Sequence, residues 1–271
     1  MIAVELRKLA LRPRTWISIG LLCLLPTIVA VFLALSRVAP RPGEGPAFLS
    51  AVLSNGQLYP AAALGIVLPI FLPLSVAVVA GESIAGEASA GTLRYLLVRP
   101  VGRTRLLVAK LVAVIVYTLT AVVAVAACGY VVGISLLGDA SLELATTTVS
   151  GTPLTSQQLM VRTVMMVGYI GWSMLGVASV SLFLSTLTDS PLAAALGGLA
   201  VLIGSTVLVT LDAADSVRAW LPTRYWLAWV DLFRDPILWR DVERGLAVQA
   251  VYIVVLLGAA WANFATRDVT S

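Results

Sequence analysis

The sequence of 271 residues contains no histidine, and charged residues make up only 12% of it. Soluble domains carry about 25% charged residues, so this chain has too few to cover a surface in water. Without histidine the H-E-x-x-H zinc helix of membrane metalloproteases is excluded, and the sequence also lacks the G-x-x-x-x-G-K-[ST] phosphate loop. The composition therefore indicates an integral membrane protein, and any uphill transport would take its energy from another chain.

Cysteine is almost as scarce, and Cys23 and Cys128 both lie inside apolar runs. Cysteine in such a setting packs as a small hydrophobe, so no disulfide framework is indicated. Clustered carboxylates that could bind a catalytic metal are also scarce, and the nearest pair is Asp212 with Asp215. We therefore expect no catalytic residue, metal site or cofactor on this chain, and no enzymatic activity.

The cations of the chain flank its apolar runs. The net charge is +4, and cations in such positions meet lipid headgroups, so we expect the bilayer as a partner and no nucleic acid. No Asp, Glu, Lys or Arg falls in the middle of an apolar run, which argues against a proton-driven pump, and no arginine ladder indicates voltage sensing. Broken helices that bind sodium through carbonyl oxygens are still compatible with this pattern.

Six runs are apolar and long enough to cross a bilayer, which takes about 20 residues. They are Trp16–Leu35, Leu58–Ala80, Leu106–Gly133, Val161–Leu184, Pro191–Leu211 and Leu246–Ala262. The first run follows basic residues, as a signal peptide does. Its core of about 20 residues exceeds the 7–15 of a cleaved signal, so we interpret it as a retained helix. The prediction is an all-α integral membrane protein with six transmembrane helices in a single domain, 1–271.

An amphipathic helix is predicted before the first run, within residues 1–14. At 100° per residue, Ile2, Leu6 and Leu9 share one face of the segment IAVELRKLALR, and Pro13 would end the helix. The charged residues flank this face, with Glu5, Lys8 and Arg12 on one side and Arg7 on the other. Such a helix lies in the membrane interface. The alternative is a frayed charged tail.

Loop charges predict the orientation, because cytoplasmic loops are rich in Lys and Arg. The N-terminal segment carries four cations and residues 81–110 carry five, whereas the loop after the first run carries two. With six spans, both termini and the 81–110 connection would face the cytoplasm of a cell inner or plasma membrane. Residues 212–245 carry five arginines yet would lie outside, but six acids accompany them and long loops count less.

The densest charge cluster lies in residues 81–110, GESIAGEASAGTLRYLLVRPVGRTRLLVAK. Within it, TLRYLLVR (92–99) predicts a short amphipathic helix, which Gly91 would precede with a sharp turn and Pro100 would end. One face would carry Leu93, Leu96 and Leu97, and the others Arg94, Tyr95 and Arg99. Ordinary positive-inside loops predict the cations but neither this helix nor the preceding acids, Glu82 and Glu87.

This stretch resembles the signature of ABC-2-type transporter permeases. The matching positions are Glu87, Gly91, Thr92, Leu93, Leu96, Leu97, Pro100, Arg103, Arg105 and Lys110. The six-span layout extends the resemblance over essentially the whole chain. Larger members carry a folded extracellular domain after the first span, whereas this chain has only the short segment 37–57 there.

The resemblance implies a permease that pairs with a separate ATP-binding cassette ATPase, which would hold ATP and Mg, and with a second permease copy or a similar permease. It implies a cytoplasmic coupling helix, in the loop 81–105, that docks on the ATPase. Its residues would be Gly91, Thr92, Leu93, Arg94, Tyr95, Leu96, Leu97, Val98, Arg99 and Pro100. Supporting charges would be Glu82, Glu87, Arg103, Arg105 and Lys110. Arginine and tyrosine are favoured anchors at interfaces.

The expected activity is export of a hydrophobic or amphipathic substrate such as a drug, lipid or peptide, since the spans lack charged residues at their centres. Two other readings stay open within the resemblance, export of an ion and a role in metalloenzyme maturation. Outside it, the chain could be a self-sufficient carrier or channel, or a membrane enzyme or assembly factor. Glu82 and Glu87 could pair with cations of the N-terminal helix or of the ATPase. Arg103, Arg105 and Lys110 would hold the third span at the headgroups.

Residues 212–245 hold four of the seven tryptophans. Trp and Tyr favour membrane interfaces, and Pro222 and Pro236 would separate two short amphipathic helices. These resemble the re-entrant outer helices before the last span of ABC-2 permeases. The candidates for an outer gate are Trp220, Tyr225, Trp226, Trp229 and Phe233. The alternative is an interface belt without a gating role.

Small residues recur four apart in the fifth run, in the pairs Ala193 with Gly197, Ala194 with Gly198 and Ala200 with Gly204. This spacing lets helix backbones approach closely. It predicts either packing within the chain or an interface between two subunits.

Overall fold

The computed structural model describes residues 1–36, 56–91, 102–138, 146–147 and 153–266. Most of these residues are helical, and six helices are long and apolar enough to cross a membrane. These six are α2 (Pro13–Ser36), α5 (Phe71–Ser89), α7 (Arg103–Leu137), α8 (Ser156–Leu187), α9 (Pro191–Thr210) and α11 (Trp239–Thr266). Five of them contain a predicted span or nearly all of it, whereas α5 contains only residues 71–80 of the second predicted span. The sequence therefore predicted the helical class and the number of spans correctly.

Shorter elements connect the long helices. They are α1 (Ile2–Leu11), the 3-10 helix η1 (Gly56–Leu58), α4 (Tyr59–Val67), η2 (Asp212–Ala214), α10 (Asp215–Arg218) and η3 (Ala228–Phe233). A two-residue antiparallel pair, β1 (Thr146–Thr147) with β2 (Pro153–Leu154), precedes α8. The helix predicted at the N-terminus is present as α1, and short helical segments are present in the region 212–238.

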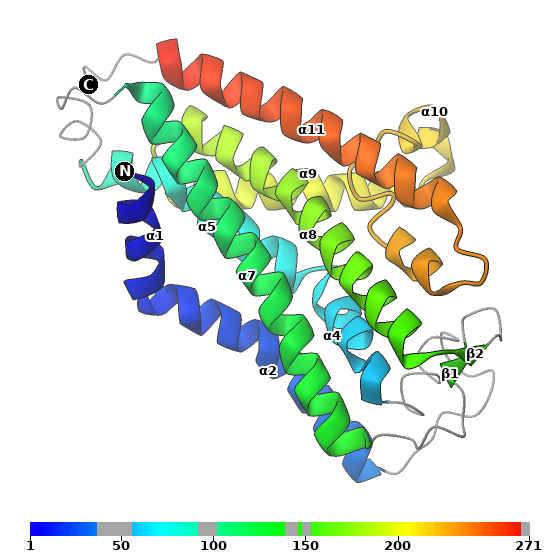
Figure 1. Cartoon of the computed structure of the whole chain (residues 1–271). Helices are drawn as coiled ribbons and strands as arrows, with labels where there is room; N and C mark the ends of the chain where they lie inside the picture. The colour runs from blue at the N-terminus through cyan, green and yellow to red at the C-terminus, as the bar shows by residue number, and fades with distance from the viewer. Residues whose placement is uncertain (37–55, 92–101, 139–145, 148–152, 267–271) are drawn as a thin grey trace.

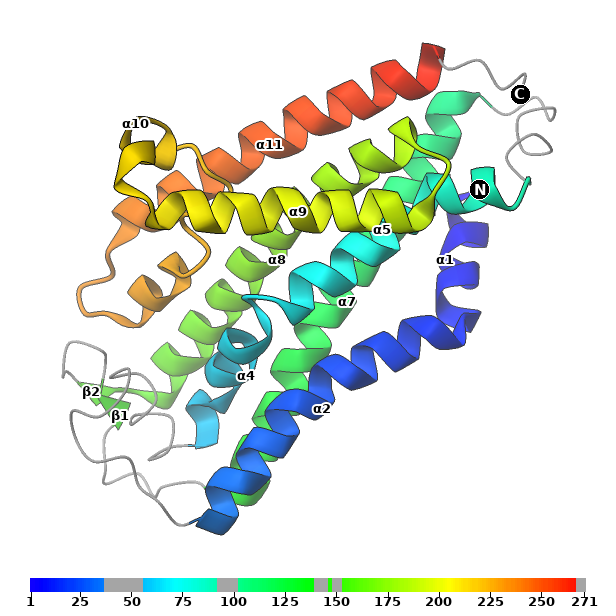
Figure 2. The same cartoon turned by 180° about the vertical axis from the view of Figure 1, so that it is seen from behind.

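The long helices form a bundle with two distinct ends (Figure 1). At one end, the α1 end, lie α1 and the last turns of α5, α8 and α11, together with the first turns of α7 and α9. At the opposite end, the far end, lie η1, the strand pair and residues 212–238 (Figure 2). The N-terminus and the end of α11 thus share one end, as an even number of crossings requires.

The helix α8 lies at the centre of the bundle and packs against α5, α7, α9 and α11. Close approach around it depends on small residues. A Cβ atom added at Gly198 of α9 would lie 2.2 Å from Oγ of Ser181 on α8, and one added at Gly81 of α5 would lie 2.8 Å from the backbone nitrogen of Ala195. These distances leave no space for a side chain. The spacing of Ala194 with Gly198 therefore serves packing within the chain.

The second predicted span, Leu58–Ala80, is wrong as a single helix. The chain turns at residues 68–70, so α4 and α5 are separate helices. Pro69 lies in this turn, and proline cannot donate the backbone hydrogen bond that a continuous helix needs. With nine residues α4 is about 14 Å long and too short to cross a bilayer.

Two helices extend beyond their predicted limits. Helix α5 continues to Ser89, so Glu82 and Glu87 lie on a helix and not in a connecting loop. Helix α11 begins at Trp239, seven residues before the predicted start at Leu246, so its first turns carry charged residues that we had assigned to the preceding region. In both cases the helix continues past its apolar part into charged sequence.

Candidate functional site

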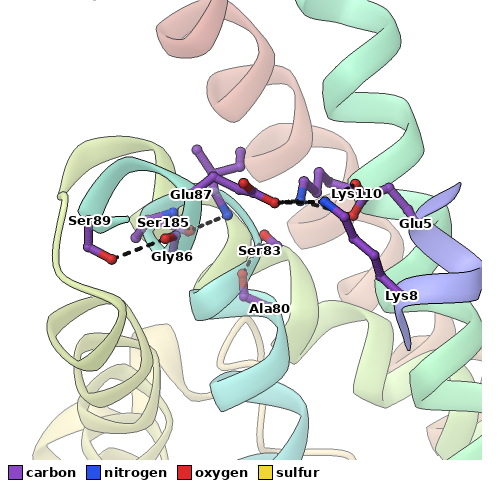
Figure 3. A network of polar contacts seen from close by, with 11 residues as sticks. Glu5, Lys8, Ala80, Ser83, Gly86, Glu87, Ser89, Lys110 and Ser185 are labelled. Atoms are coloured by element: carbon purple, nitrogen blue, oxygen red, sulfur yellow. Dashed lines mark hydrogen bonds and ion pairs between the residues drawn. The ribbon is translucent and has the colours of Figure 1, made fainter. Parts of the chain in front are cut away.

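The α1 end of the bundle holds four charged side chains in mutual contact, Glu5, Lys8, Glu87 and Lys110 (Figure 3). We refer to these four as the charge cluster. Nζ of Lys110 lies 2.9 Å from a carboxylate oxygen of Glu5 and 2.9 Å from one of Glu87. Nζ of Lys8 lies 3.2 Å from Glu87 and 3.3 Å from Glu5. The cluster therefore joins α1, α5 and α7 through two cations and two anions.

Burial makes the charge cluster sensitive to the loss of one member. The side chain of Lys110 is only 7% exposed, and those of Glu5 and Glu87 are 12% exposed. Breaking a buried ion pair by removing one partner costs about 3–5 kcal/mol, because the other charge stays desolvated. Burial alone would lower the pKa of Lys8, but Glu5 and Glu87 outweigh that effect and raise it above its ordinary value.

Lys110 is buried in the charge cluster, where its ammonium group points into the bundle because two carboxylates from other helices compensate for the lost hydration. Arg105 is exposed. The role of these cations in holding the third span at the headgroups stays a prediction. Arg103 donates a hydrogen bond to the backbone oxygen of Ala265 at 2.8 Å and so joins the start of α7 to the end of α11.

The structure also accounts for Glu82, which forms a second ion pair with the N-terminal segment. Nη1 of Arg14 lies 2.9 Å from Oε1 of Glu82. Both acids of the 81–91 stretch therefore pair with cations of the N-terminal segment, which is one of the two partners that the sequence left open. The Arg14 side chain is 77% exposed, so this pair contributes little to stability compared with the charge cluster.

Residues 92–100, the predicted coupling helix, lie outside the described residues. The structure describes its predecessor, Gly91, which has a φ of +67° and follows the end of α5. This left-handed conformation is typical of a glycine that ends a helix and turns the chain. Glu87 and Lys110, which precede and follow the undescribed segment, meet in the charge cluster.

A serine from α8 is inserted into the hydrogen bonding of α5 beside the charge cluster (Figure 3). Oγ of Ser185 donates to the backbone oxygen of Gly81 at 2.6 Å and accepts from the backbone N–H of Ala85 at 2.9 Å. It also accepts from Ile84 N–H at 3.1 Å. The hydroxyl thus bridges the carbonyl and amide that are paired in a regular helix, which fixes the last turns of α5 to α8.

A groove of about 1020 Å³ runs from the charge cluster along α2 and α5. We refer to it as the α2/α5 groove. Its walls are mostly aliphatic, and its charged residues gather at the α1 end. Ser18 of α2 and Ser75 of α5 also line it, and both hydroxyls contact the hydroxyl of the buried Tyr117. The groove is therefore apolar over most of its length, with two hydroxyl groups in its wall and charged residues at its α1 end.

Four of the five aromatic gate candidates meet at the far end. Tyr225, Trp226, Trp229 and Phe233 are buried, whereas Trp220 is 64% exposed. The rings of Trp229 and Phe233 are in edge-to-face contact with centroids 6.2 Å apart. We refer to the four buried residues as the aromatic cluster.

Hydrogen bonds attach the segment that carries the aromatic cluster to the bundle. Oη of Tyr169 on α8 donates to the backbone oxygen of Tyr225 at 2.6 Å, and Nε2 of Gln249 on α11 donates to that of Pro222 at 2.7 Å. The aromatic cluster therefore packs inward on α8 and α11. Among the tryptophans of residues 212–245, Trp220 and Trp239 are exposed, at 64% and 47%. The choice between a gate and an interface belt stays a prediction.

Sequence reasoning missed Glu5, Lys8 and Ser185 as members of the site at the α1 end. A signal existed for the first two, because a Glu and a Lys three apart lie on one side of a helix. No signal existed for Ser185, since it is one of several serines in an apolar helix. In the described residues, no group of three or more Cys, Asp or Glu side chains is arranged to hold a metal ion.

The six long apolar helices define a multi-pass helical membrane protein. The chain belongs to the family described as "Protein of unknown function (DUF2705)", whose model matches residues 24–270. A search of curated proteins found no match.

Proposed function

We propose that this protein is the permease subunit of an ATP-binding cassette exporter. A separate ATPase subunit, holding ATP and Mg, would power it, and two permease chains would form the translocation pathway in a cell membrane with their termini in the cytoplasm. The proposal rests on the resemblance of residues 81–110 to ABC-2-type permeases and on the charge cluster at the two ends of that stretch.

The charge cluster is the observation that carries this proposal. A coupling element transmits force only if its base is fixed to the helices that move. Glu87 near the end of α5 and Lys110 near the start of α7, which precede and follow the predicted coupling helix in the sequence, are joined to each other, and both contact α1 through Glu5 or Lys8. Movement of residues 92–100 would therefore move α1, α5 and α7 together.

The substrate we propose is hydrophobic or amphipathic, such as a drug, lipid or peptide. The α2/α5 groove supports this, because its walls are aliphatic and its charges gather at one end. The aromatic cluster, buried at the far end, would serve as the gate on the outer side.

Co-purification tests the proposal. The full-length chain, tagged and extracted from its native membrane, should bring down a nucleotide-binding ATPase in stoichiometric amount. Reversal of Arg94 and Arg99 to Glu should abolish this association, because both would face the ATPase. The matched control is reversal of Arg224, between α10 and η3, and Arg240, in the first turn of α11, which are both exposed and should leave the association intact.

Two results would contradict the proposal. One is an ATPase that associates equally well with the Arg94→Glu, Arg99→Glu variant, which would remove the coupling role of this segment. The other is transport by the purified chain alone in liposomes without ATP, which would identify a self-sufficient carrier or channel.

A further inference from the structure

We propose that the α2/α5 groove binds an anionic membrane lipid, with an acyl chain along α2 and α5 and the headgroup at Arg12 and Arg14. This goes beyond the proposed function, because a bound lipid requires neither an ATPase nor transport. Two features of the groove support this: its shape, and the balance of charge at its α1 end, which we refer to as its mouth.

The apolar part of the groove is longer than the hydrocarbon part of one leaflet. On α2 the lining residues run from Thr15 to Ile28, a rise of about 20 Å at 1.5 Å per residue. One leaflet contributes about 15 Å of hydrocarbon. Opposite them, α5 contributes Phe71, Leu74, Val78 and Val79. The whole of an acyl chain that spans one leaflet can therefore lie in the groove.

The side chains at the mouth carry one more positive charge than negative charge. They comprise four cations, Lys8, Arg12, Arg14 and Lys110, and three acids, Glu5, Glu82 and Glu87, so the net charge is 4 − 3 = +1. The charge cluster accounts for two of each sign, and Arg14 pairs with Glu82. In the described part of the chain no ion pair satisfies Arg12. The mouth thus favours an anionic headgroup over a zwitterionic or cationic one.

Arg12 has no ion pair within the described residues, and the side chain of Arg14, although paired with Glu82, is 77% exposed, so both can reach a headgroup. Both are exposed and lie where α1 passes into α2, at an end of the bundle that the crossing helices place at the headgroup level. Arginine binds phosphate oxygens through two parallel N–H groups. Basic pockets between membrane helices are established sites for phosphate headgroups. A phosphatidylglycerol molecule meets all these requirements.

Native mass spectrometry of the full-length protein tests the inference. The protein, released from micelles containing equal amounts of phosphatidylglycerol and phosphatidylcholine, should retain one phosphatidylglycerol molecule per chain. Replacing Arg12 and Arg14 by Gln should lower that retention about tenfold. The matched control is Arg7→Gln, which removes a cation from α1 that does not line the groove and should leave retention unchanged.

A second pair of variants tests the apolar part without altering charge. Leu21→Trp would project bulk into the groove from a side chain that is 61% exposed, so folding should be preserved while lipid retention falls. Phe32→Trp, on the same helix but outside the groove, is the control. Inorganic phosphate added to the sample should not displace the lipid, because it lacks the acyl chain.

Three outcomes would overturn the inference: equal retention of both lipids, retention unchanged in the Arg12→Gln, Arg14→Gln and Leu21→Trp variants, or a dimer that retains no lipid. Because the measurement needs no ATPase, its failure would leave the proposed function standing. Failure of the co-purification experiment would equally leave lipid binding standing.

Discussion

The carboxylate of Glu87 and the ammonium of Lys110 meet at 2.9 Å inside the bundle, although 22 residues separate them along the chain. Glu87 belongs to the last turns of α5, and Lys110 to the second turn of α7. Glu5 and Lys8 complete this contact from α1, so three helices have their relative positions fixed there.

Charge balance predicts how the cluster responds to substitution. Lys110→Met leaves Glu5 and Glu87 with one cation between them, and we expect a loss of about 3–5 kcal/mol. Adding Glu87→Gln restores neutrality, because Glu5 can still pair with Lys8, so the double variant should be more stable than Lys110→Met alone. Thermal unfolding in detergent, followed by tryptophan fluorescence, measures both. Arg14→Gln is the control and should change the stability by less than about 1 kcal/mol.

A double variant no more stable than Lys110→Met would show that Glu87 and Lys110 do not act together. Such a result would remove the structural base on which the coupling role of residues 92–100 depends.

The link from α8 to α5 should depend on the hydroxyl of Ser185. We expect Ser185→Ala to cost about 1–3 kcal/mol, because the buried polar groups of α5 lose their partner. Ser179→Ala is a suitable control, since its hydroxyl bonds to the carbonyl of Gly176 on its own helix and that carbonyl keeps its helical partner. Unfolding curves for the two variants measure this difference in stability. Equal stabilities would mean that the Gly81 carbonyl and the Ala85 N–H pair with each other when the Ser185 hydroxyl is removed.

Hydropathy predicted the parts of this fold that depend on burial in lipid. The run Pro191–Leu211 carries no charged residue and the run Leu106–Gly133 carries only Lys110, and helices α7 and α9 cover nearly all of both runs. The limits of α5 and α11 were predicted poorly, because hydropathy does not mark where a helix continues into charged sequence; in α5 the charged residues Glu82 and Glu87 have partners on the N-terminal segment. The sequence alone places Glu87 in a loop. Its contacts with Lys8 and Lys110 explain why it lies on a helix instead.

Contacts between distant helices had no local signal in the sequence. The insertion of Ser185 into α5 depends on how α8 crosses α5, and the burial of Trp229 depends on the path of residues 219–238 over α8. Neither path follows from periodicity. The pairing of the acids 82 and 87 with the N-terminal segment was one of two alternatives, and only the folded arrangement could decide between them.

Two of the three glycines of α9, Gly198 and Gly204, should respond differently to the same substitution. A Cβ at Gly198 would meet Ser181 at 2.2 Å, whereas a Cβ at Gly204 has no atom within 4 Å. Gly198→Leu should therefore destabilise the chain by about 3 kcal/mol or more, and Gly204→Leu should leave its thermal stability unchanged. If the proposed permease dimer uses the exposed face with Ala200 and Gly204, Gly204→Leu should yield monomers in size-exclusion chromatography with light scattering. An intact dimer would place the subunit interface elsewhere.

Alkaline pH should weaken the attachment of α1 through Lys8. Because Glu5 and Glu87 raise the pKa of Lys8 in the folded protein, its contribution is fully present below the ordinary lysine pKa of about 10.4 and is lost as pH rises through the raised value. The melting temperature of the wild-type protein should fall over that range. Lys8→Arg should reduce the fall, because arginine keeps its charge there and can still reach both carboxylates. Identical pH profiles for the two proteins would mean that Lys8 contributes nothing to the docking of α1, and that Lys110 alone neutralises Glu5 and Glu87.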